Sequence, residues 1–149
     1  MRHIAILGST GSIGQSALSV VAAHSDRLRV VAMAAGENIA RFVEQVGRFA
    51  PDTMAMSTPR ALADARAELH RRGSVDPARA LSGPEGLIAV ATHPAADVVL
   101  FASSGTAALD AVLAAIEARK TIALANKEIL VMRSEPAASM SAIAGSPMA

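Results

Sequence analysis

The amino-acid sequence predicts an α/β fold, in which helices cover both faces of a doubly wound parallel sheet and form three αβα layers. Short runs rich in valine, isoleucine and leucine alternate with segments of helical periodicity along the chain. Hydrophobic residues are 52% of the 149 residues, yet there is no Trp or Tyr and there are three Phe. This composition fits alanine-rich helices packed against an aliphatic sheet, and the length is typical of one domain.

Five apolar runs are strand candidates, because each is short, rich in aliphatic residues and bounded by turn residues. In chain order they are His3–Leu7, Leu28–Ala34, Thr53–Met56, Asp97–Ala102 and Thr121–Ala125. The interval 73–92 mixes turn residues with a brief apolar centre at Arg79–Leu81. We expect a minor edge strand there, followed by a short helix.

Apolar residues repeat at helical spacing between these strands. The members expected on one inward face are Ile13, Ala17, Val20 and Val21 after the run His3–Leu7, and Leu109, Val112, Leu113 and Ile116 after the run Asp97–Ala102. Two further helices are expected at Asn38–Phe49 and Pro59–Arg72. The second has a good start, because Thr58 can cap it and Pro59 suits its first turn.

Charge and composition exclude several classes of function. The formal net charge is +1, without the clustered basic residues that nucleic-acid binding requires. No apolar run is long enough for a transmembrane helix, and the run after Met1 is too short for a signal peptide. The chain has no cysteine, which fits a reducing compartment. We therefore expect a soluble cytoplasmic protein with no nucleic-acid or membrane partner.

The last 17 residues differ from the rest. After Met132 the sequence reads "RSEPAASMSAIAGSPMA", rich in Ser, Ala, Pro and Gly and without a sustained period. This pattern predicts a tail or linker stub at residues 133–149, following a cofactor-binding domain at residues 1–132.

The segment "IAILGSTGSIGQSAL" carries the strongest functional pattern, a strand followed by a glycine-rich loop and a helix. Such a loop places free backbone N–H groups at the positive end of a helix dipole, which favours an anion. Gly8, Gly11 and Gly14 could serve the turn, the approach of a pyrophosphate and the packing of helix on strand. The G-x-x-G-x-x-G spacing lacks the Gly-Lys-Ser/Thr of a P-loop. A Rossmann-like dinucleotide site is therefore expected, with a purely structural turn as the alternative.

A second position bears on the choice of dinucleotide. Rossmann-like domains that bind NAD usually carry an acid about 20 residues after the loop, whereas those that bind NADP carry a cation for the 2′-phosphate. Here that place reads "AAGEN", with Glu37 as the acid. By itself Glu37 favours NAD, because a carboxylate repels a 2′-phosphate. The alternative is a solvated acid in the first turn of the next helix.

Four stretches taken together resemble one family. "ILGSTGSIGQSAL", "VVAMAAGEN", "LSG" and "LAAIEARKTIALANKEILV" are similar, in order and distance, to the N-terminal NADPH-binding domain of 1-deoxy-D-xylulose-5-phosphate reductoisomerase. The resemblance covers about residues 1–131. It implies an enzyme that rearranges 1-deoxy-D-xylulose 5-phosphate and reduces the product with NADPH to 2-C-methyl-D-erythritol 4-phosphate for isoprenoid synthesis. It also implies a divalent metal, Mg²⁺, Mn²⁺ or Co²⁺, in the full-length enzyme.

The resemblance also implies roles for particular residues. Lys127 would reach the substrate, and its compact ammonium suits a hydroxyl or phosphate oxygen. Gly36 and Asn38 would lie with Glu37 at the adenosine end of the cofactor. The other residues expected at the cofactor are Gly8, Thr10, Gly11, Ser12, Ile13, Gly14, Gly105, Asn126 and Glu128.

The sequence departs from the family pattern in two places. The family usually carries Lys or Arg where this chain has Glu37; Arg41 or Arg60 could supply the missing cation. Beyond residue 131 the family continues into an Asp-Ser-Glu metal motif, a substrate loop and a helical domain. After Glu128 this chain has a single acid, Glu135, so we expect no metal site and no catalytic residue here. We expect a truncated cofactor domain that is inactive alone.

Two alternatives remain open at this stage. One is a non-catalytic NADP(H)-binding module, and the other is a different G-x-x-G-x-x-G oxidoreductase. A semialdehyde dehydrogenase is opposed by the absence of cysteine, because that chemistry uses a thiolate. Ser103 and Ser104 follow a strand candidate and could line a ligand site or cap the next helix. An isolated domain would expose an apolar patch, so a homodimer is a further expectation.

Overall fold

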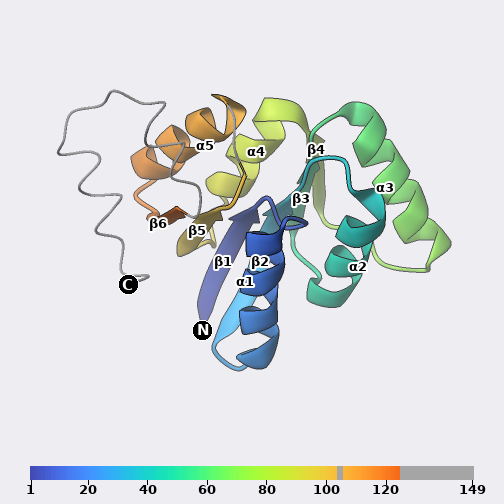
Figure 1. Cartoon of the computed structure of the whole chain (residues 1–149), viewed down its shortest axis with the longest axis horizontal. Coiled ribbons are helices and arrows are strands. Elements are labelled where there is room, and N and C mark those ends of the chain that lie inside the picture. The colour runs from blue at the N-terminus through green and yellow to red at the C-terminus, as the bar shows by residue number, and fades with distance from the viewer. Residues whose placement is uncertain (104–105, 125–149) are drawn as a thin grey trace.

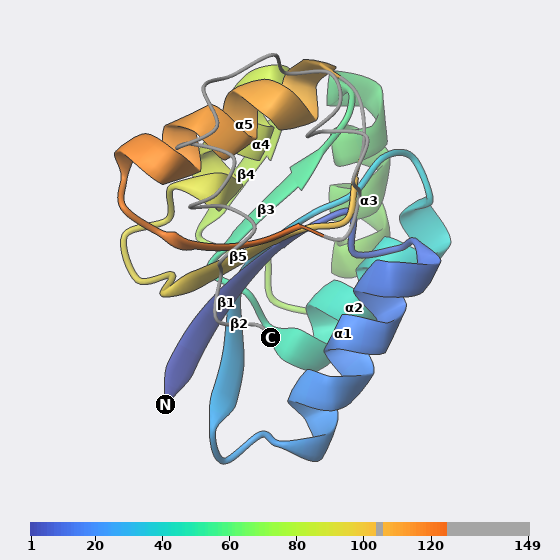
Figure 2. The same ribbon diagram turned by 60° about the vertical axis from the view of Figure 1, so that its left-hand side comes forward.

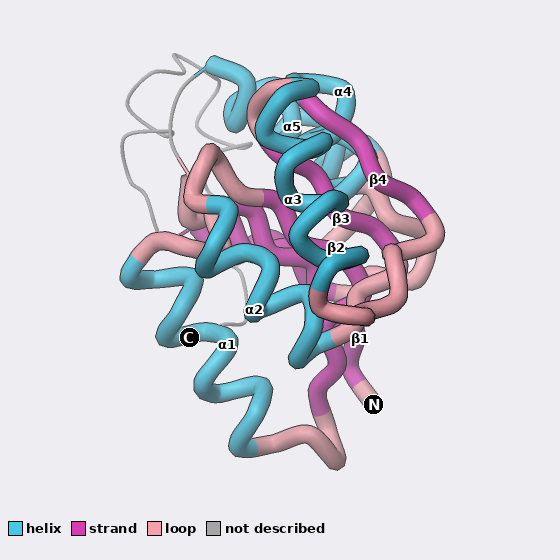
Figure 3. Tube along the Cα trace, turned by 90° about the vertical axis from the view of Figure 1, so that its right-hand side faces the viewer, coloured by secondary structure: helices cyan, strands magenta, loops and turns pink. Residues whose placement is uncertain are grey.

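A six-stranded parallel sheet forms the centre of the molecule in a computed structural model that describes residues 1–103 and 106–124 (Figure 1). The strands are β1 (Arg2–Leu7), β2 (Leu28–Ala34), β3 (Thr53–Met56), β4 (Arg79–Ser82), β5 (Val98–Phe101) and β6 (Thr121–Leu124). The helices are α1 (Ser12–Ala23), α2 (Ile39–Phe49), α3 (Pro59–Arg71), α4 (Gly83–Ala91) and α5 (Thr106–Glu117). Strand and helix alternate along the described chain (Figure 3).

The order of the strands creates a switch point beside β1. The sheet runs β4-β3-β2-β1-β5-β6, so the chain builds outward from β1 in one direction and then returns to its other side at β5. All neighbouring strands pair in parallel. Their carboxyl ends therefore meet at one end of the sheet, and ligands of such sheets bind at that end, near the switch point.

Helices cover both faces of the sheet and give two separate cores. Figure 2 shows α4 and α5 on one face and α1 and α2 on the other. The α4/α5 side is built largely from alanine and valine with Phe101 as its largest member. The other side is packed by larger residues, among them Phe42, Met33 and Met54, and includes α3. This arrangement confirms the predicted three-layer α/β fold.

The predicted strands are confirmed within one or two residues, and so are the edge strand β4 and the helix α4 that follows it. The predicted inward face of α1 is partly wrong. Ile13 and Val20 are 48% and 53% exposed, and the buried residues are Gly14, Leu18 and Val21. The face of α1 that carries Gly14 lies inward because Gly14 packs directly on the backbone of the preceding loop.

The inward face of α5 also differs from the prediction. Its buried residues are Ala108, Ala111, Val112 and Ala115, whereas Ile116 is 37% exposed. Small side chains allow α5 to lie close to α4 and to the sheet, so the alanines make the contact that larger residues were expected to make. None of the helices within the described ranges is both long and apolar enough to cross a lipid bilayer.

His93 lies at the amino end of the sheet and makes the stability of the fold dependent on pH. Burial lowers the pKa of His93; nearby Asp52 opposes this shift, and Lys120, Arg79 and His3 reinforce it. Just below the ordinary histidine pKa of about 6.5, the unfolded chain binds a proton that the folded chain does not. The stability should therefore fall as the pH is lowered from 7.5 to 5.5.

Urea unfolding at the two pH values measures this effect. In the wild type, His93 Nδ1 accepts a hydrogen bond from the Ala95 N–H at 3.1 Å. His93→Asn removes the titrating ring and keeps an acceptor for this N–H. We expect this variant to lose less stability on acidification than the wild type. His70→Asn, at an exposed position, controls for the substitution itself. An unchanged pH dependence in His93→Asn would contradict the assignment.

Candidate cofactor-binding site

Gly8 ends β1 in a conformation that requires glycine. Its φ is +90°, in the region that L-amino acids rarely adopt. A Cβ at this position would also lie 2.8 Å from the carbonyl carbon of Ala102 and the nitrogen of Ser103, just beyond β5. The loop after β1 therefore turns against the backbone that follows β5, directly at the switch point.

Gly14 allows α1 to pack against the same loop. A Cβ on Gly14 would lie 2.2 Å from the Gly8 carbonyl oxygen and 2.6 Å from the Ser9 Cα. These are backbone atoms, which cannot move aside as a flexible side chain would. The last glycine of the pattern thus serves the close helix–strand packing that the sequence predicts for it.

The start of α1 has free N–H groups at the carboxyl end of the sheet. Gly11 is the N-cap and provides no side-chain hydrogen bond, and the first turn contains no acidic residue. The N–H groups of Ser12, Ile13 and Gly14 have no partner within the helix, because an α-helix leaves its first N–H groups unpaired. The Thr10 N–H makes no hydrogen bond to the described residues either. Together with the helix dipole, these donors suit an anion.

A pocket of about 370 Å³ opens beside this loop at the carboxyl end of the sheet. Residues that follow all of the first five strands line it, together with parts of α4 and α5. They are Gly8, Ala34, Ala35, Gly36, Ser57, Gly83, Pro84, Leu87, Ser103 and Ala107. The lining is small and mainly apolar, so the pocket could accept a flat heterocycle next to the anion-binding loop.

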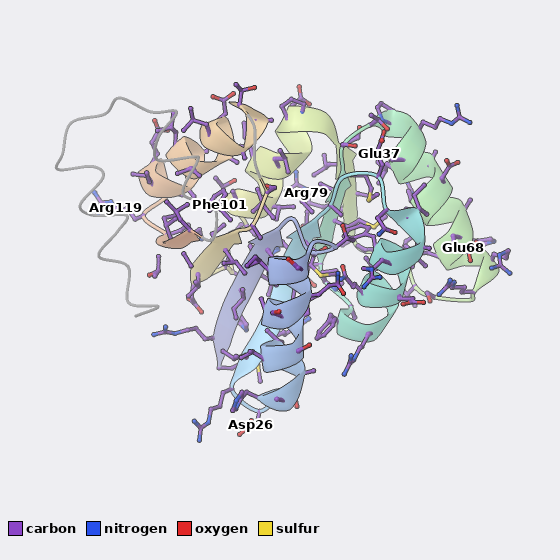
Figure 4. The ribbon with its side chains drawn as sticks, viewed as in Figure 1. Asp26, Glu37, Glu68, Arg79, Phe101 and Arg119 are labelled. Atoms are coloured by element: carbon purple, nitrogen blue, oxygen red, sulfur yellow. The ribbon has the colours of Figure 1, made fainter. Side chains whose placement is uncertain are left out.

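Glu37 lies at this same end of the molecule, opposite to Asp26 (Figure 4). The segment before α2 is exposed, and it is anchored by Ser57 Oγ, which donates to the Gly36 carbonyl at 3.0 Å. Asn38 is the N-cap of α2, and its Oδ1 accepts from the Arg41 N–H at 3.3 Å. Glu37 therefore precedes the helix rather than lying in its first turn, and it is exposed next to Gly36, which lines the pocket.

Several residues missed by the sequence analysis belong to this site. Gly83 and Leu87 come from the interval 73–92, which carries no functional motif, and Ser57 follows a strand without any motif. Ser103, for which the sequence leaves open a place in a ligand site or a capping role, has a hydroxyl that is buried without a partner among the described residues. A bound ligand that accepts or donates at this oxygen would satisfy it.

The described residues hold part of the predicted site. Gly8, Thr10, Gly11, Ser12, Ile13 and Gly14 form one loop and helix start. At the same end of the sheet Gly36 lines the pocket, and Glu37 and Asn38 follow it in the chain. Ser104, Gly105, Asn126, Lys127, Glu128 and the predicted tail, 133–149, lie outside the described residues. In the part of the chain that the structure describes, no group of three or more His, Asp or Glu could hold a metal ion.

A glycine-rich loop with free N–H groups at the switch point of a parallel sheet places this chain in the Rossmann-like class of dinucleotide-binding folds. The comparison with family models is more specific. The model for 1-deoxy-D-xylulose 5-phosphate reductoisomerase matches residues 4–134. The chain therefore belongs to the 1-deoxy-D-xylulose 5-phosphate reductoisomerase family.

Individual relatives agree with this assignment. The reductoisomerase of Anaeromyxobacter sp. (strain K) is 45% identical over 148 residues, which are 99% of this chain and 37% of that protein. The reductoisomerase of Symbiobacterium thermophilum is 47% identical over 134 residues, which are 90% of this chain and 35% of that protein. The chain thus spans about a third of the length of these relatives.

Solved structures of the family have the same fold. A structure of DOX-P reductoisomerase in complex with NADPH, fosmidomycin and magnesium has a TM-score of 0.84 at 34% identity, and the match covers 98% of this chain and 35% of that one. The Zymomonas mobilis enzyme in complex with NADPH has a TM-score of 0.82 at 34% identity, covering 96% of this chain and 36% of that one.

Proposed function

We propose that this chain is the NADPH-binding domain of a 1-deoxy-D-xylulose 5-phosphate reductoisomerase. The observation that carries the proposal is the loop from Gly8 to Gly14 at the switch point, where the N–H groups of Thr10 and of the first turn of α1 are free beside a pocket of about 370 Å³. Family membership favours this function over that of another oxidoreductase with the same glycine spacing. NADPH, when bound, would supply the hydride for reduction of the rearranged substrate.

Each part of the proposed site has a chemical role. Thr10, Gly11, Ser12 and Ile13 surround the diphosphate, and Thr10, Ser12 and Ile13 donate to it through backbone N–H groups. The Gly11 N–H instead donates to the Gly8 carbonyl at 3.4 Å. Gly36, Glu37 and Asn38 surround the adenosine ribose, and the adjoining pocket takes the adenine. Beyond the described residues, Gly105, Asn126 and Glu128 contact the cofactor and Lys127 contacts the substrate, as the family resemblance implies.

The complete reaction requires more than this domain. The family places the metal-binding carboxylates and the substrate loop beyond residue 131, in the part of the enzyme that follows this region. We infer that residues 1–132 bind the cofactor but do not convert the substrate alone. The tail or linker stub expected at residues 133–149 lies outside the described residues. The cytoplasmic location and the homodimer predicted from the sequence remain predictions.

The proposed function is tested by calorimetric titration of NADPH into the 149-residue chain, with Ser12→Asp as the informative variant. Ser12 is exposed in the first turn of α1. A carboxylate at this position stabilises the helix through its dipole but repels the cofactor diphosphate. We expect the wild type to bind NADPH and the variant to bind it about tenfold more weakly, with no loss of thermal stability.

The matched control is Ser16→Asp, which adds the same charge one turn further along α1 at another exposed position. It should retain most of the wild-type affinity. If the wild type does not bind NADPH, or if both variants bind as the wild type does, the loop is not the diphosphate site.

A further inference from the structure

A hydrogen bond from Gln45 of α2 connects that helix to the glycine-rich loop. Gln45 is buried, with 8% of its surface exposed, and its Nε2 donates to the Ser9 carbonyl oxygen at 2.9 Å. Ser9 is itself fully buried. The bond joins residues that are 36 positions apart, so it connects α2 to the loop rather than stabilising either one locally.

The next carbonyl of the loop is held in the same way. Gln15 of α1 donates from Nε2 to the Thr10 carbonyl at 2.8 Å, and its Oε1 accepts from the Arg41 guanidinium. Arg41 belongs to α2, one turn before Gln45. Two successive carbonyl groups of the loop therefore each accept from a glutamine side chain, and α2 supports both contacts.

The direction of these carbonyls decides which groups the loop presents to a ligand. In a trans peptide the C=O and the next N–H point in opposite directions. Because Gln45 draws the Ser9 carbonyl toward α2, the Thr10 N–H faces away from α2. That N–H has no hydrogen-bond partner among the described residues. Rotation of the same peptide would turn a carbonyl, with its negative partial charge, toward an anion.

Packing alone does not account for a glutamine at position 45. The Gln45 Oε1 is buried and makes no hydrogen bond to the described residues. A buried amide oxygen without a partner is destabilising, and an unbranched apolar side chain of similar length would fill the space without that penalty. The donor to Ser9 is therefore the useful part of this side chain.

We propose that Gln45 is a positioning residue for the cofactor: it fixes the Ser9–Thr10 peptide so that the Thr10 N–H points at the diphosphate. The proposal rests on the proposed function, because it assigns an orienting residue to the same NADPH site. It implies that Gln45 affects ligands that carry the diphosphate and not ligands that occupy the adenosine end alone.

The test compares Gln45→Met with the wild type, using NADPH and adenosine 2′-phosphate as the two probes. Methionine keeps the length of the side chain and removes the donor. We expect the Kd for NADPH to rise about tenfold and the Kd for adenosine 2′-phosphate to stay unchanged. Glu44→Met, at the neighbouring exposed position, is the control and should change neither value.

The outcomes separate this inference from the proposed function. If the wild type binds neither probe, the NADPH site itself is wrong. If the wild type binds both and Gln45→Met binds NADPH equally well, or loses both probes to the same degree, the positioning role is overturned. Should Gln45→Met not fold, Gln15→Met releases the neighbouring Thr10 carbonyl and must show the same split between the two probes.

Discussion

Gly14→Ala is expected to destabilise the fold by about 3 kcal/mol or more and to abolish NADPH binding. The added Cβ would lie 2.2 Å from the Gly8 carbonyl oxygen and 2.6 Å from the Ser9 Cα, so α1 and the loop must separate. That movement breaks the packing of α1 and displaces the N–H groups proposed to bind the diphosphate. Urea unfolding and NADPH titration measure the two effects.

Gly47→Ala provides the matched control for the same change in side chain. Gly47 lies in the interior of α2, where its Cβ would meet Ser74 Oγ at an ordinary distance of 3.6 Å. Alanine is the better helix former, so this variant should be more stable than the wild type by about 0.5–1 kcal/mol. If Gly14→Ala were as stable as the wild type, α1 would not pack against the loop as closely as the structure shows.

Glu37→Lys is expected to raise the preference for NADPH over NADH by roughly thirtyfold, or about 2 kcal/mol. Glu37 is exposed and follows Gly36, which lines the pocket, so its carboxylate would face the 2′-phosphate of NADPH. Reversing the charge replaces repulsion of that phosphate by attraction, whereas NADH has no phosphate at this position. Calorimetric titration of both cofactors at low salt measures the change, which should shrink as salt is added.

Glu117→Lys makes the same change in net charge at the end of α5, on an exposed residue away from the pocket. It should leave the ratio of the two affinities unchanged. If Glu37→Lys also leaves that ratio unchanged, Glu37 does not face the 2′-phosphate. Arg41 or Arg60 would then be the groups to replace next in a search for the cation.

The fold could be predicted because its signals are local. Short aliphatic runs between turn residues located the strands, and the loop spacing located Gly8, Gly11 and Gly14. The φ of +90° at Gly8 and the close approach of Gly14 to the loop give these glycines a physical reason that agrees with their spacing. The class of fold and the place of the candidate site therefore followed from sequence pattern.

Long-range contacts could not be predicted in this way. The inward face of α1 depends on the contact of Gly14 with the loop, and periodicity alone selected the larger but exposed Ile13 and Val20. Gln45 looks like an ordinary polar helical residue until the structure brings it to Ser9. The pocket residues Ser57 and Gly83 come from separate strand ends and share no motif.

The most direct test of the central claim is to follow the backbone amide resonances of the ¹⁵N-labelled chain while NADPH is added. Saturable shifts should concentrate at Thr10, Gly11, Ser12 and Ile13, and at Gly36 and Gly83 around the pocket. The amides of His3 and His93, at the amino end of the sheet, should remain in place. Shifts confined to the amino end, or no saturable shift at the loop, would contradict the account.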